Sequence, residues 1–435
     1  MSLNRFTRAL TLGAAAVTTA ATLSACAGGT TPAPSKDDKA NENTIKFWSN
    51  HPGSSRDIEM ELINKFQEKN PDLKVELVDA GANYEELAQK FNAALAGGDL
   101  PDVIVASDVT WFNFALNDAT TPLDELWDKY NIDSSSYVDT LKDDYKYKDK
   151  HYGVPYSRST NLMYWNTNDL AAAGLPTDRG PKTWEEFDEW AGKLMEKTGH
   201  PALVVPDGSN YLDWYFEGMN WAHGGSYSDE WKPTFTSAET IKAGTFLQDQ
   251  VNKGHIQIAT DPTVAFGNGN ASSLLESTGS LGGLTKSATI PFVTTYLPGP
   301  GPSAATGGAG LAVPKNISDK RKENAVKFID FMTNTENTIT FSQKTGYMPV
   351  RKDALQNPEE RAFLDKNPNA ETAIKQLNEN TKPQDYARVF IPGGGKRIGA
   401  ALDRITVGKE DVNTVFGDLQ KETEDVYKRD IEPKL

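Results

Sequence analysis

The chain has 435 residues, of which 38% are hydrophobic, 10% aromatic and 24% charged. This composition is that of a soluble globular protein of two or three domains, and it excludes collagen-like or wholly disordered chains. The 60 acidic and 45 basic residues give a formal net charge of -15, which argues against nucleic acid or an anionic membrane surface as a partner.

The N-terminus has the pattern of a bacterial lipoprotein signal. Arg5 and Arg8 precede a run of small and apolar residues from Ala9 to Leu23, which is shorter than the roughly 20 residues of a membrane-spanning helix. The run ends in Leu23-Ser24-Ala25-Cys26, which resembles the lipobox that is cut before its cysteine. We therefore expect residues 1–25 to be a signal peptide and Cys26 to carry a lipid; the alternative is a chance cysteine in an ordinary signal.

Residues 26–43 are predicted to form a flexible tether after the lipidated cysteine. This stretch is rich in Gly, Thr, Pro, Ser, Asp and Lys and has no aromatic residue, a composition that does not bury enough apolar surface to fold. The expected location is extracytoplasmic, with the protein anchored by its lipid to the outer face of the cell membrane.

From Thr44 onward, predicted strands alternate with predicted helices. Strands are expected at Ile45–Trp48, Leu73–Val78 and Asp102–Ala106, and helices after Ser54 or Ser55 and after Asn83. This β-α-β-α-β order predicts a doubly wound lobe, whose ligands bind outside the carboxyl ends of the strands. We therefore expect the ligand near Ser49, Tyr84 and Asp108.

A second lobe is predicted to begin near Tyr156. Its first strand is expected at Asn161–Trp165, and Thr183 with Glu186 fits a capping box that opens a helix ending at Gly199. Later segments are predicted as a strand over 311–313, a helix from about Ser318, and mostly helix beyond Arg361.

The residues give little support for catalysis or a metal site. The five histidines (His51, His151, His200, His223 and His255) are scattered, and no two have the close spacing of a helical metal pair. A Gly-x-Ser-x-Gly elbow and a phosphate loop ending in Gly-Lys-Ser/Thr are both absent from the sequence. Paired carboxylates for glycoside cleavage leave no short signature, so a tethered glycoside-acting enzyme stays open as an alternative.

Three glycine clusters offer backbone N–H groups to a small anion. They are Ser277–Gly283, Thr306–Gly310 and Pro392–Arg397. Backbone N–H groups bind phosphate without a net positive charge, and Arg388 or Arg397 could add bidentate contacts. The alternative interpretation is that the clusters are ordinary turns and the arginines are solvated.

Aromatic residues are concentrated at residues 211–221. Aromatic faces stack on sugars or hold a quaternary ammonium through cation–π attraction. Such a stretch is more often part of a core, so both interpretations of this run, Trp214 included, stay open.

The order of several motifs resembles the group-1 extracellular solute-binding proteins of ABC importers for carbohydrates. These motifs are the lipobox, Asn83-Tyr84-Glu85, Pro101-Asp102-Val103, Tyr164-Trp165-Asn166, Pro181 to Trp184, Phe328 to Phe331 and Lys344 to Pro349. The later motifs, including Ser277 to Leu281 and Gln343 to Tyr347, are most similar to members that take glycerol 3-phosphate and glycerophosphodiesters. The resemblance spans roughly residues 44–430.

The resemblance implies an α/β, two-lobed periplasmic-binding-protein fold of type II, with a ligand cleft between lobes joined by hinge strands. It implies a first lobe from 44–155 and about 295–350, and a second from 156–294 and about 351–435. It also implies ligand contacts from residues at the family's contact positions, which are Tyr84, Asp108, Ser159, Ser277, Gly308, Tyr347 and Arg397, and more loosely Trp214. Asp108 departs from the pattern, because it stands where the relative carries a glutamate, and its shorter side chain puts one contact to the glycerol hydroxyls in doubt. Pro392–Lys396 carries one residue more than the pattern, which leaves open whether Arg397 or Arg388 meets the anion.

The resulting hypothesis is a binding lipoprotein of an ABC importer, not an enzyme, that needs no cofactor or metal. It captures glycerol 3-phosphate or a glycerophosphodiester by hinge closure and delivers it as a monomer to permease subunits, with a separate ATPase supplying energy. A binder of neutral oligosaccharides with the same fold, using Tyr84, Asp108 and the aromatic run, is the alternative.

Overall fold

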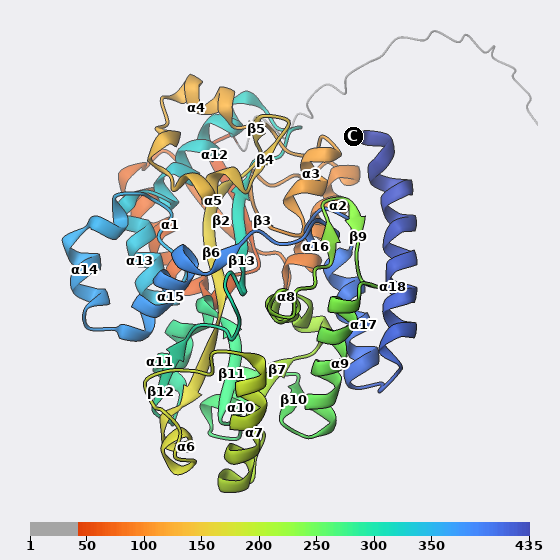
Figure 1. Cartoon of the computed structure of the whole chain (residues 1–435). Coiled ribbons are helices and arrows are strands. Elements are labelled where there is room, and N and C mark those ends of the chain that lie inside the picture. The colour runs from red at the N-terminus through yellow and green to blue at the C-terminus, as the bar shows by residue number, and fades with distance from the viewer. Residues whose placement is uncertain (1–41) are drawn as a thin grey trace, which may run out of the picture.

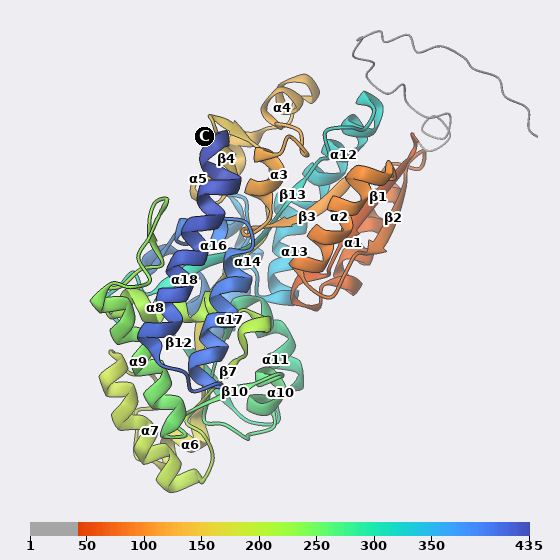
Figure 2. The same ribbon diagram turned by 90° about the vertical axis from the view of Figure 1, so that its right-hand side faces the viewer.

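The computed structural model describes residues 42–435 and shows a mixed α/β protein of two lobes (Figures 1 and 2). The predicted signal peptide and the predicted lipid site at Cys26 lie outside the described residues. One sheet of ten strands runs through both lobes in the order β10-β7-β11-β6-β13-β3-β1-β2, with β12 on β6 and β14 on β13. No helix in the described part of the chain is long and apolar enough to span a membrane.

The first lobe is built on the predicted β-α-β-α-β run. It comprises β1 (Thr44–Ser49), α1 (Arg56–Lys69), β2 (Lys74–Asp79), α2 (Tyr84–Gly97) and β3 (Val103–Ser107). The Asn83 side chain accepts the Glu86 backbone N–H and thereby caps α2, and Gly98 ends the helix in the left-handed conformation. Every residue of β3 is buried, as expected for a strand covered on both faces.

Two strands, β6 (Val154–Asn166) and β13 (Ala304–Ala312), connect the lobes. All thirteen residues of β6 are buried. Its first half pairs with β13, which also pairs with β3 of the first lobe, and its second half pairs with β11 and β12 of the second lobe. Figure 1 shows β6 as one continuous strand running from the upper to the lower lobe.

The glycine cluster at 306–310 is part of strand β13 and not a turn. Gly308 has a positive φ of 101°, and a Cβ there would lie 1.9 Å from the carbonyl oxygen of Ser157. A Cβ on Gly307 would meet the Trp214 ring at 2.4 Å. Glycine is therefore required at both positions so that β13 can closely approach β6 and the helix α8 (Leu212–Ala222), which carries Trp214.

The second lobe carries its own strands and helices around β6. They are α6 (Thr167–Ala172), α7 (Trp184–Thr198), β7 (Leu203–Pro206), α8 (Leu212–Ala222), α9 (Ala238–Asn252), β10 (Ile256–Ala259), α10 (Pro262–Gly267), β11 (Ser273–Ser277), α11 (Leu281–Ser287) and β12 (Phe292–Thr295). The Glu186 N–H donates to Thr183 Oγ1 at 3.2 Å, which caps α7 as the sequence predicts.

The remaining elements complete the two lobes. They are α3 (Trp111–Leu116), α4 (Asp124–Tyr130), α5 (Asp139–Asp143), β4 (Lys146–Tyr147), β5 (Lys150–His151), β8 (Ser228–Asp229), β9 (Lys232–Pro233), α12 (Asp319–Met332), α13 (Thr335–Thr345), α14 (Pro358–Leu364), α15 (Pro368–Glu379), β14 (Thr381–Lys382), α16 (Tyr386–Val389), α17 (Gly394–Thr406) and α18 (Val412–Val426).

The C-terminal segment touches both lobes. Residues Val412, Val415 and Phe416 of α18 belong to the core of the second lobe, whereas Ile431 just beyond it belongs to the core of the first. Figure 2 shows α18 running up the side of the molecule, with the C-terminus near α3 and β4 of the upper lobe. This segment is thus a further connection between the lobes, which the sequence patterns did not predict.

Candidate functional site

A cavity of about 570 Å³ lies between the lobes, and we call it the interlobe cavity. The first lobe contributes the segments that follow β1 and β3 and the start of α2, and the second lobe contributes α8 and the end of β11. The hinge strands contribute Ser159, Gly307 and Gly308. The cavity therefore lies at the carboxyl ends of the first-lobe strands, where binding is expected for such sheets.

Eight of the nine residues proposed as ligand contacts line this cavity. They are Tyr84, Asp108, Ser159, Trp214, Ser277, Gly308, Tyr347 and Arg388. They come from segments far apart in the chain, in two lobes that the antiparallel pair of β6 and β13 joins.

Arg397 does not line the interlobe cavity. Its Nη1 donates to the carbonyl oxygen of Pro392 at 2.6 Å, and its charged surroundings are Glu422, Arg429 and Asp430. Burial lowers the pKa of its guanidinium. Gly393, whose backbone is left-handed with φ 69°, caps the N-terminus of α17, and Arg397 lies in the first turn of this helix. Of the two arginines left open by the sequence, Arg388 is the one that lines the interlobe cavity.

Arg388 is held by a buried ion pair. Its Nε lies 2.7 Å from Asp213 Oδ2, and both side chains are almost fully buried. Burial raises the pKa of Asp213 to about 6, although Arg388 opposes this. Arg388 Nη1 also donates to Gln384 Oε1. The guanidinium is thereby fixed at the edge of the cavity, as a group that recognises anions should be.

Asp108 belongs to a second charged cluster. Its Oδ1 accepts from Arg158 Nη1 at 2.5 Å, and Arg158 also donates from Nη2 to Asp144 Oδ2 at 2.6 Å. Burial raises the pKa of Asp144 to about 6. Asp108 Oδ2 accepts from Gln384 Nε2 at 2.8 Å. Because both oxygens are engaged, Asp108 is a fixed acceptor facing the cavity and suits ligand hydroxyl groups.

Aromatic residues from both lobes meet at the cavity. The rings of Tyr84 and Tyr211 have their centroids 6.3 Å apart, and the Tyr211 hydroxyl donates to Glu85 Oε2 at 3.2 Å. Trp214 donates from Nε1 to the Thr306 carbonyl at 3.1 Å. Most of the aromatic run is packed in the core of the second lobe, and Tyr211, Trp214 and Tyr215 also line the cavity. Whether these rings contact a ligand stays a prediction.

Small residues bring the lobes together around Tyr347. A Cβ on Gly279 would lie 2.5 Å from Cζ of Tyr347, and one on Gly53 would lie 2.7 Å from its Cε2. Burial raises the pKa of the Tyr347 hydroxyl well above its ordinary value. Tyr347 is therefore a neutral hydrogen-bonding group at physiological pH.

His51 is a lining residue that sequence reasoning missed. It follows β1 in the left-handed conformation, and its Nδ1 lies 2.5 Å from Glu59 Oε2 of α1. The sequence holds no spacing signal for this pair, because a left-handed turn separates the strand from the helix. The position of Ser49 and Asn50 at the end of a predicted strand was the nearest available indication.

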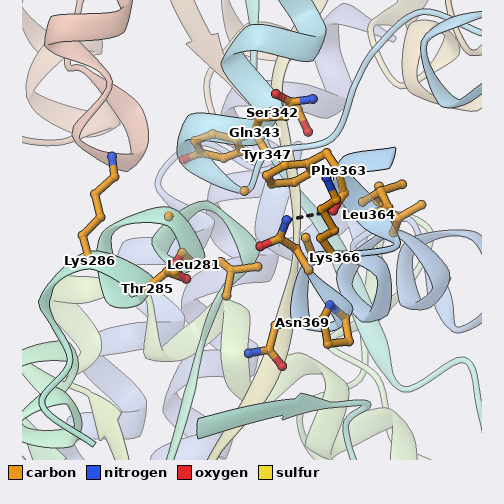
Figure 3. A pocket seen from close by; sticks show the side chains of 16 residues that line it. Leu281, Thr285, Lys286, Ser342, Gln343, Tyr347, Phe363, Leu364, Lys366 and Asn369 are labelled. Atoms are coloured by element: carbon orange, nitrogen blue, oxygen red, sulfur yellow. Dashed lines mark hydrogen bonds between the residues drawn. The ribbon is translucent and has the colours of Figure 1, made fainter. Parts of the chain in front are cut away.

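A second, smaller pocket of about 220 Å³ lies between α11, α13 and the α14–α15 region. Figure 3 shows Leu281, Thr285 and Lys286 of α11 on one side and Ser342 and Gln343 of α13 on another, with residues of the α14 and α15 region closing it. Tyr347 lines both hollows. Within residues 42–435, no cluster of three or more His, Cys, Asp or Glu residues could hold a metal ion.

Comparison with known proteins identifies the family. Residues 61–372 match the family described as bacterial extracellular solute-binding protein. The chain belongs to this family.

The curated relatives include glycerophosphate binders. The sn-glycerol-3-phosphate-binding periplasmic protein UgpB of Salmonella typhimurium is 27% identical over 395 residues, covering 86% of this chain and 87% of the relative. UgpB of Escherichia coli is 27% identical over 384 residues, covering 83% and 86%. The family and these relatives are substrate-binding proteins.

Solved structures extend the likeness to the whole fold. The crystal structure of UgpB from Mycobacterium tuberculosis in complex with glycerophosphocholine is 47% identical, with a TM-score of 0.86 over 89% of this chain and 99% of that one. The sugar-binding protein MalE of Xanthomonas citri is 20% identical, with a TM-score of 0.71 over 89% and 98%. The second likeness concerns the fold alone, and it confirms the two-lobed binding-protein architecture.

Proposed function

We propose that this protein is the substrate-binding subunit of an ABC importer for glycerol 3-phosphate or glycerophosphodiesters such as glycerophosphocholine. The observation that carries the proposal is the interlobe cavity, where a buried arginine, a fixed carboxylate and a group of aromatic side chains converge. An arginine suits a phosphate, a carboxylate suits glycerol hydroxyls, and aromatic faces suit an apolar or quaternary ammonium head group. The 47% identical relative crystallised with glycerophosphocholine supports the same ligand class.

The proposed contacts are Tyr84, Asp108, Ser159, Ser277, Gly308, Tyr347 and Arg388, with Trp214 beside the head group. Arg388 replaces Arg397 in this set because it lines the cavity. The Gly308 carbonyl accepts from the Asp108 N–H at 3.1 Å, so the close approach of β13 also helps to position Asp108.

The proposed action is capture and delivery without chemistry. Ligand contacts from both lobes favour the closed arrangement, and β6 and β13 act as the hinge. The closed form then docks on permease subunits, and a separate ATPase supplies the energy. The binding-protein family of the chain supports a role without catalysis.

Lipid attachment at Cys26 and a tether over 26–43 remain part of this proposal. Together they would hold a monomeric protein at the outer face of the cell membrane. Metabolic labelling with a radioactive fatty acid tests this directly, because labelling should be lost in Cys26→Ser and kept in the parent chain.

Calorimetric titration of the soluble mature protein tests the ligand. We expect heat with glycerophosphocholine or glycerol 3-phosphate and none with maltose or maltotriose. Heat with the neutral sugars alone would overturn the phosphate assignment and favour the oligosaccharide binder, in which Tyr84, Asp108 and the aromatic run at 211–221 would make the contacts. Breakdown of a glycan or phosphodiester during incubation would instead indicate an enzyme.

A further inference from the structure

Among residues 42–435, two basic side chains line the interlobe cavity, those of Arg388 and His51. Arg388 already faces Asp213 at 2.7 Å, and its Nη1 is occupied by Gln384. Asp108 adds a further carboxylate to the same lining. An anionic ligand therefore meets one arginine whose charge is largely compensated, and a second cation would improve the match of charge.

The backbone and Glu59 fix the orientation of the His51 ring. The His51 N–H donates to Ser49 Oγ at 2.9 Å, and its Nδ1 lies 2.5 Å from Glu59 Oε2. Glu59 is fully buried, and its other oxygen accepts from Ser49 Oγ at 2.7 Å and from the Tyr156 hydroxyl at 3.3 Å. A carboxylate that only accepts holds Nδ1 as a donor.

The second ring nitrogen of His51 is unused by the protein. Nε2 is buried and has no hydrogen-bond partner among residues 42–435. A buried polar atom without a partner is costly, and His51 lines the cavity. Since Nδ1 is engaged by Glu59, Nε2 is the ring atom available to a ligand.

We propose that His51, held as an imidazolium by Glu59, donates its Nε2–H to a phosphoryl oxygen of the bound ligand, so that affinity for a phosphodiester falls as the pH rises. This inference rests on the proposed function. It adds His51 as a ligand contact, because His51 is not among the contact residues that the family resemblance implies.

The charges around His51 act in the required direction. The pKa of His51 is raised, and the hydrogen bond to Glu59 is the largest cause. The negative charges of Glu59 and Asp79 also raise this pKa, whereas burial and the positive charge of Arg56 lower it. Tyr156 and Tyr347 face the same region and stay neutral, because burial raises the pKa of both hydroxyls. Glu276 lines the cavity on the second-lobe side, and burial raises its pKa as well.

Glycerophosphocholine is the suitable probe because a phosphodiester keeps one negative charge between about pH 5 and about pH 9, whereas a phosphate monoester titrates near pH 6. Affinity should be measured calorimetrically at several pH values in this range for the parent protein, His51→Gln and His200→Gln. His200 is a matched control because it pairs with Asp169 at 3.3 Å and does not line the cavity.

We expect the parent and His200→Gln to lose about tenfold in affinity between pH 5.5 and pH 8.5, which corresponds to the ligand raising the pKa of His51 by about one pH unit. His51→Gln should bind about tenfold more weakly at the low end and should show a flatter pH dependence. Asp144 and Asp213, with pKa values of about 6, contribute in the same direction. The decisive quantity is therefore the difference between the parent and His51→Gln profiles.

A proton NMR titration of the His51 ring in the parent protein provides a readout that does not depend on the variant folding. Saturating glycerophosphocholine should raise the pKa of this ring. An unchanged pKa, or a His51→Gln profile that coincides with the parent, would overturn the inference while the proposed function stands. Failure of the parent protein to bind glycerophosphocholine at every pH would overturn both.

Discussion

The Gln384 side chain donates from Nε2 to Asp108 Oδ2 at 2.8 Å, although 276 positions separate the two residues in the chain. The same nitrogen donates to the Thr306 carbonyl at 2.8 Å, and Gln384 Oε1 accepts from Arg388. One neutral amide thus joins the acidic and basic groups of the interlobe cavity and fixes the distance between them. Replacing Gln384 is the most direct test of whether this arrangement sets affinity.

Gln384→Met keeps the length of the side chain but removes both donor and acceptor. We expect a loss of about tenfold in glycerophosphocholine affinity and of about 1–3 kcal/mol in stability, because Asp108 Oδ2 and Arg388 Nη1 lose a buried partner. Calorimetry and urea denaturation measure the two effects. Gln384→Glu should weaken binding further, since it adds a negative charge; equal binding by both variants would contradict this account.

Arg388→Gln should reduce the affinity for glycerophosphocholine by at least about thirtyfold, because truncating one partner of a buried charge pair costs about 2–5 kcal/mol. Arg397→Gln is the matched control and should bind within about twofold of the parent, since Arg397 contacts Pro392 outside the cavity. Thermal denaturation of both variants separates loss of binding from loss of folding. A strong effect in Arg397→Gln alone would restore the assignment that the family motif suggested.

Gly308→Ala should destabilise the hinge. A Cβ at this position would lie 1.9 Å from the Ser157 carbonyl oxygen, and the residue has a φ of 101°. Strained backbone and overpacking each cost about 1–3 kcal/mol, so we expect a loss of several kcal/mol by urea denaturation or failure to fold. Gly192→Ala, in α7 with open space around the position, should instead stabilise the protein by up to about 1 kcal/mol.

Asp213 should make stability depend on pH. Burial raises its pKa to about 6 from 3.8, so the folded protein binds the proton more tightly than the unfolded chain. Protonation of Asp213 therefore stabilises the folded protein, by at most about 3 kcal/mol. This stabilisation is fully present below pH 3.8, the pKa of the group in the unfolded chain, and it is lost as the pH rises through about 6. Urea denaturation of the parent and of Asp213→Asn between about pH 4 and about pH 7 measures this. The variant should show the shallower decline; parallel curves would exclude Asp213 as the cause.

Much of the architecture was predictable because local patterns coincide with the global fold. Asn83 and Thr183 cap their helices as expected, and the apolar run ending at Ala106 is the buried strand β3. The order of the motifs was sufficient to indicate the family, and eight of the nine proposed contact residues line one cavity.

Other features depended on contacts between distant segments. Only tertiary pairing shows that β6 runs unbroken from Val154 to Asn166, because a strand buried on both faces has no alternating pattern. Arg388 lines the cavity and Arg397 does not, and this difference depends on the fold of the segment that leads into α17, which no periodicity predicts. His51 and Glu59 meet across a left-handed turn. The sequence by itself thus determined the elements and the family, whereas tertiary packing decided the positions of the charged side chains in the cavity. The reason is that an ion pair depends on the distance between two groups in the folded structure, which their separation along the chain does not reveal.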